Sequence, residues 1–176
     1  MKNQATQLPW QDFTALYREI GPKILRHVMR LCANKDVAEE ILQETILAMY
    51  THRHSFQGRS SVATWAYRIA TNKWIDHSRR AWNKVRFDSP FIQRAPDCGP
   101  SPEQQVIMNE DGQKLRQALD QLPPEQKAAL YLVRFEGLKY REAAEILEVS
   151  LSTVRMRVYY GLLALKRSLG ESQNEE

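Results

Sequence analysis

The feature that most constrains this chain is the helical spacing of its apolar residues, whose longest break divides the chain in two. Between Phe13 and Ile20, for example, apolar side chains recur at the three- and four-residue intervals of one helix face. The alternation typical of half-buried strands is essentially absent. The break is a proline-rich stretch, residues 88–102, which is typical of a linker. We therefore predict an all-α fold of two small helical domains, residues 1–87 and 105–176, joined by a flexible linker at 88–104.

About four helices are expected in the first domain. The Gly21-Pro22 pair should interrupt the first apolar face, because proline lacks the N–H that an interior turn needs. Asp36, followed three residues later by Glu39, has the N-cap and N3 chemistry of a helix start. After a polar loop at 51–60, a serine at position 60 or 61 could cap a further helix.

The charges of this domain separate onto two surfaces. One helix face is acidic and polar, with Asp36, Glu40, Gln43 and Glu44 together. From 52 to 86 the chain carries eight basic residues, and one acid, Asp76, lies among them. Such a stretch would attract a polyanion, although charge alone equally allows a solvated helix face. The net charge of +4 and the isoelectric point of about 9.1 permit a nucleic-acid or membrane-surface partner without deciding between them.

Several classes of protein are disfavoured. The N-terminal residues are polar, and no apolar run approaches the ~20 residues needed to cross a bilayer, so we expect a cytoplasmic protein. Cys32 and Cys98 lie far apart, and neither has a second cysteine or a histidine at the spacing of a zinc site. We expect Cys32 to be buried and Cys98 to have no chemical role, rather than either to sense redox state. The four histidines have no paired carboxylate and are expected at the surface or facing DNA. No glycine-rich phosphate loop or nucleophile elbow occurs, so the sequence predicts neither an enzyme nor a cofactor or metal site.

The C-terminal domain has the spacing of a helix-turn-helix. A helix starting within residues 122–125 (LPPE) should stop at Gly137, and two more should follow at 140–147 and from 151 to about 169, with Ser150 as the cap of the last. In that last helix Arg155 could read a guanine edge, and Ser152 or Thr153 could hold a phosphate. The alternative is a helical hairpin whose charged residues touch nothing.

Five segments together resemble one family, the sigma-70 family, and within it the small extracytoplasmic-function (ECF) group. Residues 38–45 (AEEILQET) are similar to the segment that docks on the clamp coiled coil of RNA polymerase. Residues 56–72 (FQGRSSVATWAYRIATN) resemble the loop and helix that melt and read the −10 element. Three further segments resemble the domain that reads the −35 element: residues 122–126 (LPPEQ), 137–144 (GLKYREAA) and 152–155 (STVR). The matches cover nearly the whole chain, in order and at the family's spacing.

The resemblance implies an alternative sigma factor that binds core polymerase and directs promoter-specific initiation. Its implied partners are the clamp coiled coil and flap of core polymerase, duplex and single-stranded promoter DNA, and an anti-sigma factor that could hold it at the inner membrane face. The docking residues would be Asp36, Glu40, Gln43 and Glu44. The −10 contacts would be Arg53, Phe56, Arg59, Ser60, Trp65, Arg68, Asn72, Lys73, Asp76, Arg79 and Arg80. The −35 contacts, in the helix-turn-helix at 140–160, would be Ser152, Thr153, Arg155, Met156, Arg157 and Tyr159.

Some positions remain open or depart from the family. Trp65 could equally be a core residue, and Ile69 is expected to be one. Glu148 stands in the turn where the family often has glycine, so this turn either avoids positive φ or is slightly strained. The rivals are a helix-turn-helix repressor or activator that never touches polymerase, an enzyme, and a purely structural helical protein. None of the three explains the acidic helix, the basic aromatic segment and the helix-turn-helix together.

Overall fold

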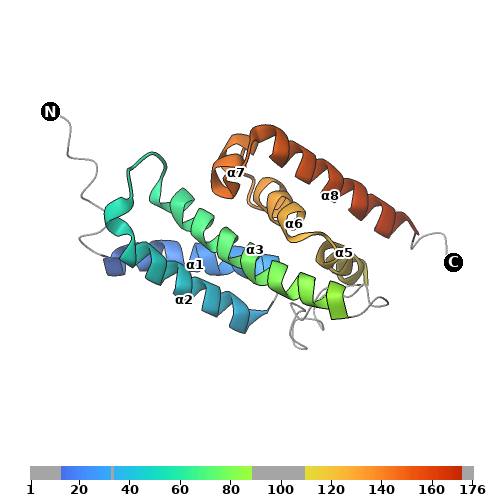
Figure 1. Cartoon of the computed structure of the whole chain (residues 1–176), viewed down its shortest axis with the longest axis horizontal. Coiled ribbons are helices and arrows are strands. Elements are labelled where there is room, and N and C mark those ends of the chain that lie inside the picture. The colour runs from blue at the N-terminus through green and yellow to red at the C-terminus, as the bar shows by residue number, and fades with distance from the viewer. Residues whose placement is uncertain (1–12, 33, 89–109, 172–176) are drawn as a thin grey trace.

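The computed structural model describes residues 13–32, 34–88 and 110–171, and within these every regular element is helical (Figure 1). The predicted fold class is therefore confirmed. Cys98 and the expected linker beyond Asp88 lie outside the described residues. The elements are α1 (Phe13–Cys32), α2 (Lys35–Thr51), the 3₁₀ turn η1 (Arg53–Ser55), α3 (Val62–Asp88), α5 (Glu110–Asp120), α6 (Pro124–Leu130), the π-helical turn η2 (Tyr131–Phe135), α7 (Tyr140–Leu147) and α8 (Leu151–Glu171).

Helix α1 runs without a break through Gly21-Pro22, so the predicted interruption is wrong. The proline removes one backbone donor, but it lies on the exposed side of the helix. Ile20 and Ile24, on either side of the pair, are both buried and keep one continuous apolar face. Gly21 is buried too, and a Cβ there would approach the Tyr17 ring to 3.2 Å. Tertiary packing outweighs the local cost of the proline.

The N-terminus of α2 was predicted two residues too late. Asn34, not Asp36, is the N-cap, and its side-chain oxygen accepts a hydrogen bond from the Val37 amide at 3.2 Å. Asp36 lies in the first turn, where its charge still favours the helix dipole. The predicted serine cap of α3 is confirmed at Ser61, whose Oγ accepts from the Thr64 amide at 3.0 Å.

The second domain follows the predicted helix-turn-helix closely. Helix α7 spans Tyr140–Leu147 as expected, and Ser150 caps α8 by accepting from the Thr153 amide at 3.1 Å. The preceding helix ends in the π-helical turn before Gly137, which has a φ of +70°. Glu148 takes the left-handed conformation, with φ of 52° and ψ of 40°. The turn therefore does not avoid positive φ but holds a non-glycine residue in a slightly strained conformation, the second of the two alternatives left open by the sequence.

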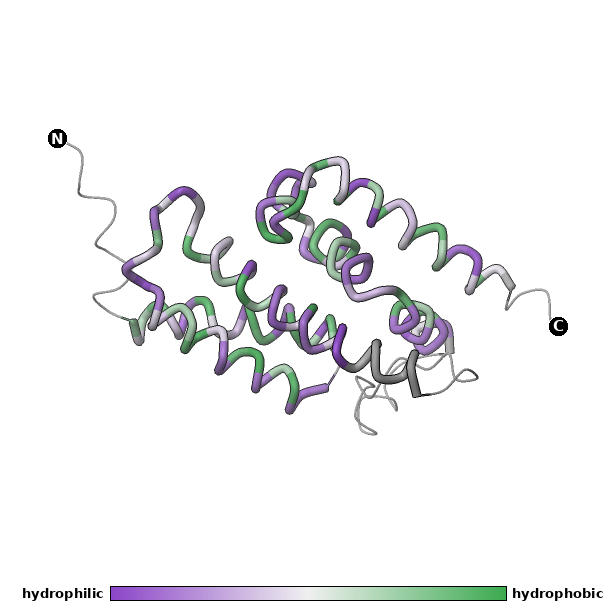
Figure 2. Tube along the Cα trace, in the orientation of Figure 1, coloured by the Kyte–Doolittle hydropathy of each residue, from purple (hydrophilic) through white to green (hydrophobic). Residues whose placement is uncertain are grey.

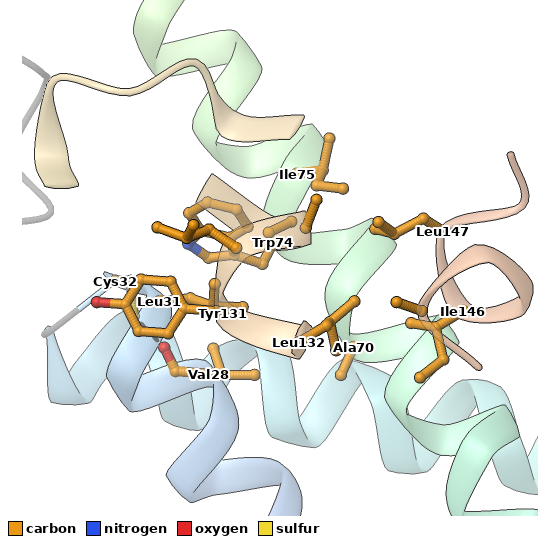
Figure 3. Close-up of a cluster of buried hydrophobic side chains, with 14 of the residues drawn as sticks. Val28, Leu31, Cys32, Ala70, Trp74, Ile75, Tyr131, Leu132, Ile146 and Leu147 are labelled. Carbon is orange, nitrogen blue, oxygen red and sulfur yellow. Dashed lines mark hydrogen bonds between the residues drawn. The ribbon is translucent and has the colours of Figure 1, made fainter. Parts of the chain in front are cut away.

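The two sets of helices pack directly against each other through α3. Figure 1 shows α3 running between α1 and α2 on one side and α6 and α7 on the other. Figure 2 shows hydrophobic and hydrophilic residues interspersed along the helices, as expected for helices with one apolar and one polar side. At the contact, Trp74 and Ile75 of α3 lie with Tyr131, Leu132 and Leu147 in one buried cluster (Figure 3). The described parts of the two domains thus share a hydrophobic core.

Candidate polymerase and nucleic-acid interfaces

The acidic face of α2 is fully accessible to a partner. Asp36, Glu40, Gln43 and Glu44 are all exposed on the helix side opposite the core residues of α2. Of these, Glu44 accepts a 2.7 Å hydrogen bond from the Lys73 ammonium on α3. The remaining carboxylates are available to a basic surface.

Two apolar side chains that sequence reasoning missed extend this face toward the end of α2. Leu47 is 65% exposed and Tyr50 is 50% exposed. The Tyr50 ring packs edge-to-face on Phe13, with 5.3 Å between ring centroids, and the Arg53 guanidinium lies 4.4 Å from its centroid. Leu47 does not follow the three- and four-residue spacing of the buried residues of α2, and this departure in the sequence could have indicated an exposed apolar side chain. An apolar anchor beside acidic groups is typical of a protein interface.

The loop after η1 presents one aromatic ring supported by another. Phe56 is half-buried, and its ring centroid lies 5.3 Å from that of Trp65. Trp65 is only 7% exposed, so it packs in the core and would act on a ligand through Phe56. Arg59 is exposed and Ser60 half-buried. The Gly58 φ of +65° gives the loop its sharp bend.

A polar stripe along α3 meets the second domain. Arg68, Asn72, Asp76 and Arg79 recur at three- and four-residue intervals along α3 and so share one face, and three of the four bind acidic side chains of the second domain. Arg68 Nη1 and Asn72 Nδ2 lie 3.4 and 3.3 Å from the two carboxylate oxygens of Glu148. Asp76 is exposed and lies 4.0 Å from the Arg79 guanidinium. Part of this stripe is therefore engaged by the second domain.

The other end of this contact is an ion pair between Arg79 and Glu125. Glu125 Oε1 accepts from Arg79 Nη2 at 2.5 Å and from Nε at 3.2 Å. Burial alone would raise the pKa of Glu125, but the hydrogen bond and charge of Arg79 outweigh it and leave that pKa below its usual value. The same hydrogen bond raises the pKa of Arg79. Next to this pair, Arg80 is exposed and available.

A buried histidine forms the third contact between the domains. His27 is completely buried, so the prediction of surface or DNA-facing histidines is wrong for this residue. Its Nε2 lies 3.0 Å from Thr71 Oγ1, and its Nδ1 lies 3.5 Å from Glu136 Oε1. Arg30 Nη1 donates to the same oxygen at 2.9 Å. His27 and, to a lesser extent, Arg30 lower the pKa of Glu136. The pKa of the nearby Tyr67 hydroxyl is raised, mainly by burial and secondly by the charge of Glu136.

Helix α8, the expected recognition helix of the helix-turn-helix, presents its N-terminal half to solvent. Ser152, Arg155, Met156 and Tyr159 are exposed, as predicted, and Arg157 is half-buried. The half-buried Thr153 is engaged in the helix cap, because its hydroxyl lies 2.8 Å from Ser150 Oγ. Arginine among exposed apolar and aromatic side chains is suited to guanine edges and thymine methyl groups.

Nothing in the described part of the chain resembles a metal centre, since no three His, Cys, Asp or Glu side chains gather there. His52 and His54 are exposed. Cys32 is buried, as expected, with its thiol 3.1 Å from the Val28 carbonyl oxygen. None of the described helices combines the length and the apolarity that a bilayer crossing requires.

Comparison with known proteins identifies the class. Residues 16–84 match the model of sigma-70 region 2, and residues 112–165 match that of sigma-70 region 4. The ECF RNA polymerase sigma factor SigE of Mycolicibacterium smegmatis is 33% identical over 98% of this chain, which spans 66% of that relative's length. RNA polymerase sigma factor YlaC of Bacillus subtilis is 32% identical over 92% of this chain and 94% of its own.

Two solved structures share the fold. Sigma factor RpoE of Bartonella quintana, in complex with anti-sigma factor NepR, superposes with a TM-score of 0.66, 23% identity and coverage of 91% of this chain and 98% of its own. CnrH, in complex with the cytosolic domain of CnrY, superposes with a TM-score of 0.67 and 17% identity, and the match covers 96% of this chain and 94% of CnrH.

The chain belongs to the sigma-70 family. Within it, the chain is an ECF sigma factor with regions 2 and 4, a non-enzymatic factor that directs transcription initiation. Hereafter α1–α3 are called region 2 and α5–α8 region 4.

Proposed function

We propose that this sigma factor divides promoter recognition among three surfaces. The acidic face of α2 docks on the clamp coiled coil of core polymerase, and region 4 contacts the flap. The recognition helix reads −35 duplex through Arg155 and its neighbours. The loop and helix at 56–72 then capture a base of the opened −10 strand.

The observation that carries the docking proposal is the exposure of Glu40 and Gln43 on a helix whose other side is buried core. A basic coiled coil would find complementary charge there, together with the apolar anchor Leu47. For the −10 strand, Phe56 offers a stacking surface beside Arg59, and base stacking on an aromatic ring contributes about 1–3 kcal/mol. For the −35 element, the outward Arg155 can make a bidentate contact with guanine.

We also propose that an anti-sigma factor holds the free protein and that the protein works in the cytoplasm, as family membership implies. One of the similar solved structures is a complex of sigma factor RpoE with the anti-sigma factor NepR, and the other is a complex of CnrH with the cytosolic domain of CnrY. If that partner spans a membrane, the sigma factor is held at the inner membrane face.

Run-off transcription tests the proposed function directly. Purified core polymerase is incubated with and without this protein on a pooled genomic promoter library. We expect new start sites that share two spaced sequence elements, which would also supply the promoter sequence. Binding to core polymerase without any new transcript would refute the promoter-reading assignment, and absence of core binding would refute the docking assignment.

A further inference from the structure

Helix α8 carries an exposed methionine at the centre of the side that faces away from the core. Val154, Val158 and Gly161 are buried and mark the inner side of the helix. At about 3.6 residues per turn, Met156 lies about 200° around the helix from Val154 in one direction and from Val158 in the other. Its side chain is 48% exposed. Figure 1 shows α8 along the outer edge of the molecule, with α6 and α7 on its inner side.

Two tyrosines adjoin this methionine. Tyr159 and Tyr160 follow Met156 by three and four residues, the two intervals at which side chains are neighbours on a helix surface. They are 59% and 48% exposed, and their rings meet edge to face with 5.4 Å between centroids. Because helical side chains lean toward the N-terminus, both rings cover the turn that contains Met156. Met156, Tyr159 and Tyr160 are called the apolar patch below.

Few polar groups at this end of α8 remain for hydrogen bonds to bases. The Ser152 and Thr153 hydroxyls each lie 2.8 Å from Ser150 Oγ, so they belong to the helix cap. Arg157 is half-buried, whereas Arg155 is exposed. In the N-terminal half of α8 a single exposed guanidinium therefore accompanies the three exposed side chains of the apolar patch.

The chemistry of the apolar patch fits one kind of base edge. In the major groove the base pairs present hydrogen-bond donors and acceptors, and thymine adds its C5 methyl group. We propose that the apolar patch reads thymine methyl groups of the −35 element, and that Tyr160, which lies outside the −35 contacts expected from the sequence, is a specificity-determining residue. Arg155 then reads a guanine beside these thymines. This inference rests on the proposed function, because it needs the N-terminal half of α8 to enter the major groove.

Replacement of thymine by uracil isolates this contact. Uracil lacks the C5 methyl group but presents the same hydrogen-bonding groups as thymine. A protein that reads only hydrogen bonds or phosphates therefore binds the two bases equally well in a duplex. Loss of one buried methyl contact corresponds to about a fourfold loss of affinity.

The test uses the full chain and a DNA pool, so it does not depend on polymerase. The wild-type protein selects from short duplexes with a randomised centre, and the most enriched duplex is remade with deoxyuridine in place of each thymine in turn. Fluorescence anisotropy gives dissociation constants for the wild type, Met156→Ala, Tyr160→Ala and Tyr160→Phe. The matched control is Leu162→Ala, because Leu162 is an apolar residue of the same helix that is 38% exposed and lies in its C-terminal half.

We expect deoxyuridine at one or more positions to weaken binding by the wild type and by Leu162→Ala about fourfold per methyl group. Met156→Ala and Tyr160→Ala should each bind the thymine and uracil duplexes equally at one of these positions. Tyr160→Phe should keep the wild-type sensitivity, since it keeps the ring. Both alanine substitutions truncate exposed side chains, and circular dichroism verifies that the variants remain folded.

Several results would overturn the proposal. If no sequence is enriched, if the enriched duplex lacks thymine, or if deoxyuridine never weakens wild-type binding, the apolar patch reads no methyl group and is left as a surface for a protein partner. Sensitivity that persists in both alanine variants would place the methyl contact elsewhere on the protein. An equal loss of sensitivity in Tyr160→Phe and Tyr160→Ala would assign the effect to the Tyr160 hydroxyl group and remove its role as an apolar reader.

Run-off transcription distinguishes this inference from the proposed function. New promoter-directed transcripts without any methyl sensitivity would overturn the inference and leave the proposed function intact. Methyl-sensitive duplex binding by a protein that directs no transcription would have the opposite meaning: the apolar patch reads thymine, and the proposed function fails.

Discussion

The left-handed residue in the helix-turn-helix gives a prediction whose sign can be worked out from the structure. Glu148 combines a φ of 52° with a carboxylate that bridges Arg68 and Asn72 across the region interface. Substitution by alanine removes the bridge but keeps the Cβ that makes this conformation unfavourable. Substitution by glycine removes both the bridge and the conformational strain.

The magnitudes of the two effects differ. The left-handed conformation costs a non-glycine residue roughly 1–2 kcal/mol. The ion pair joins side chains that are 39% and 59% exposed, so solvent screening limits it to about 0.2–1 kcal/mol. We therefore expect Glu148→Ala to lower the free energy of unfolding by up to about 1 kcal/mol. The glycine variant should be more stable than the alanine variant by about 1 kcal/mol.

Thermal and urea unfolding of the full chain measure this difference. For a protein of this size, 1 kcal/mol corresponds to about 2–4 °C in Tm. Glu145, which is exposed inside α7, provides a control of opposite sign: there glycine should be less stable than alanine by about 1 kcal/mol. Equal stability of the glycine and alanine variants at position 148 would refute the assignment of strain to this turn.

Four further predictions concern the separate surfaces. Glu40→Lys combined with Glu44→Lys should weaken binding to core polymerase, since it places like charges against a basic coiled coil; unchanged affinity in a competition assay would reject the docking face. Arg155→Ala should cost about 1–3 kcal/mol on the protein's own promoter and relax one base position; an equal loss on every DNA sequence would make it a phosphate contact. Phe56→Ala should leave formation of the closed promoter complex unchanged and slow the melting of promoter DNA; normal permanganate reactivity of −10 thymines would argue against a role of Phe56 in melting. Glu136, whose pKa His27 and Arg30 lower, should stabilise the packing of region 4 on region 2 at neutral pH and lose that effect only in the acid range where glutamates titrate, so a radius of gyration that rises between pH 8 and 6 would contradict its role.

The sequence by itself determined the helical class of the chain, several helix termini and the family. The helical spacing fixed an all-α chain, and the helix-turn-helix bounds at Tyr140–Leu147 follow from short-range signals. The same holds for the serine caps at Ser61 and Ser150, because a cap involves residues only three positions apart. The ordered motifs of regions 2 and 4 needed no coordinates to indicate a sigma factor.

Only the tertiary structure decided the features that depend on distant partners. The continuity of α1 through Pro22 comes from burial of the residues on either side, and the burial of His27 comes from packing against α3 and region 4. The sequence showed charge on the α3 stripe but not that Glu148 would bind it. Arg30 and Glu136 are 106 positions apart, and no periodic pattern encodes such a pair. Long-range pairings arise when apolar faces dock, and the choice of faces is a property of the whole fold.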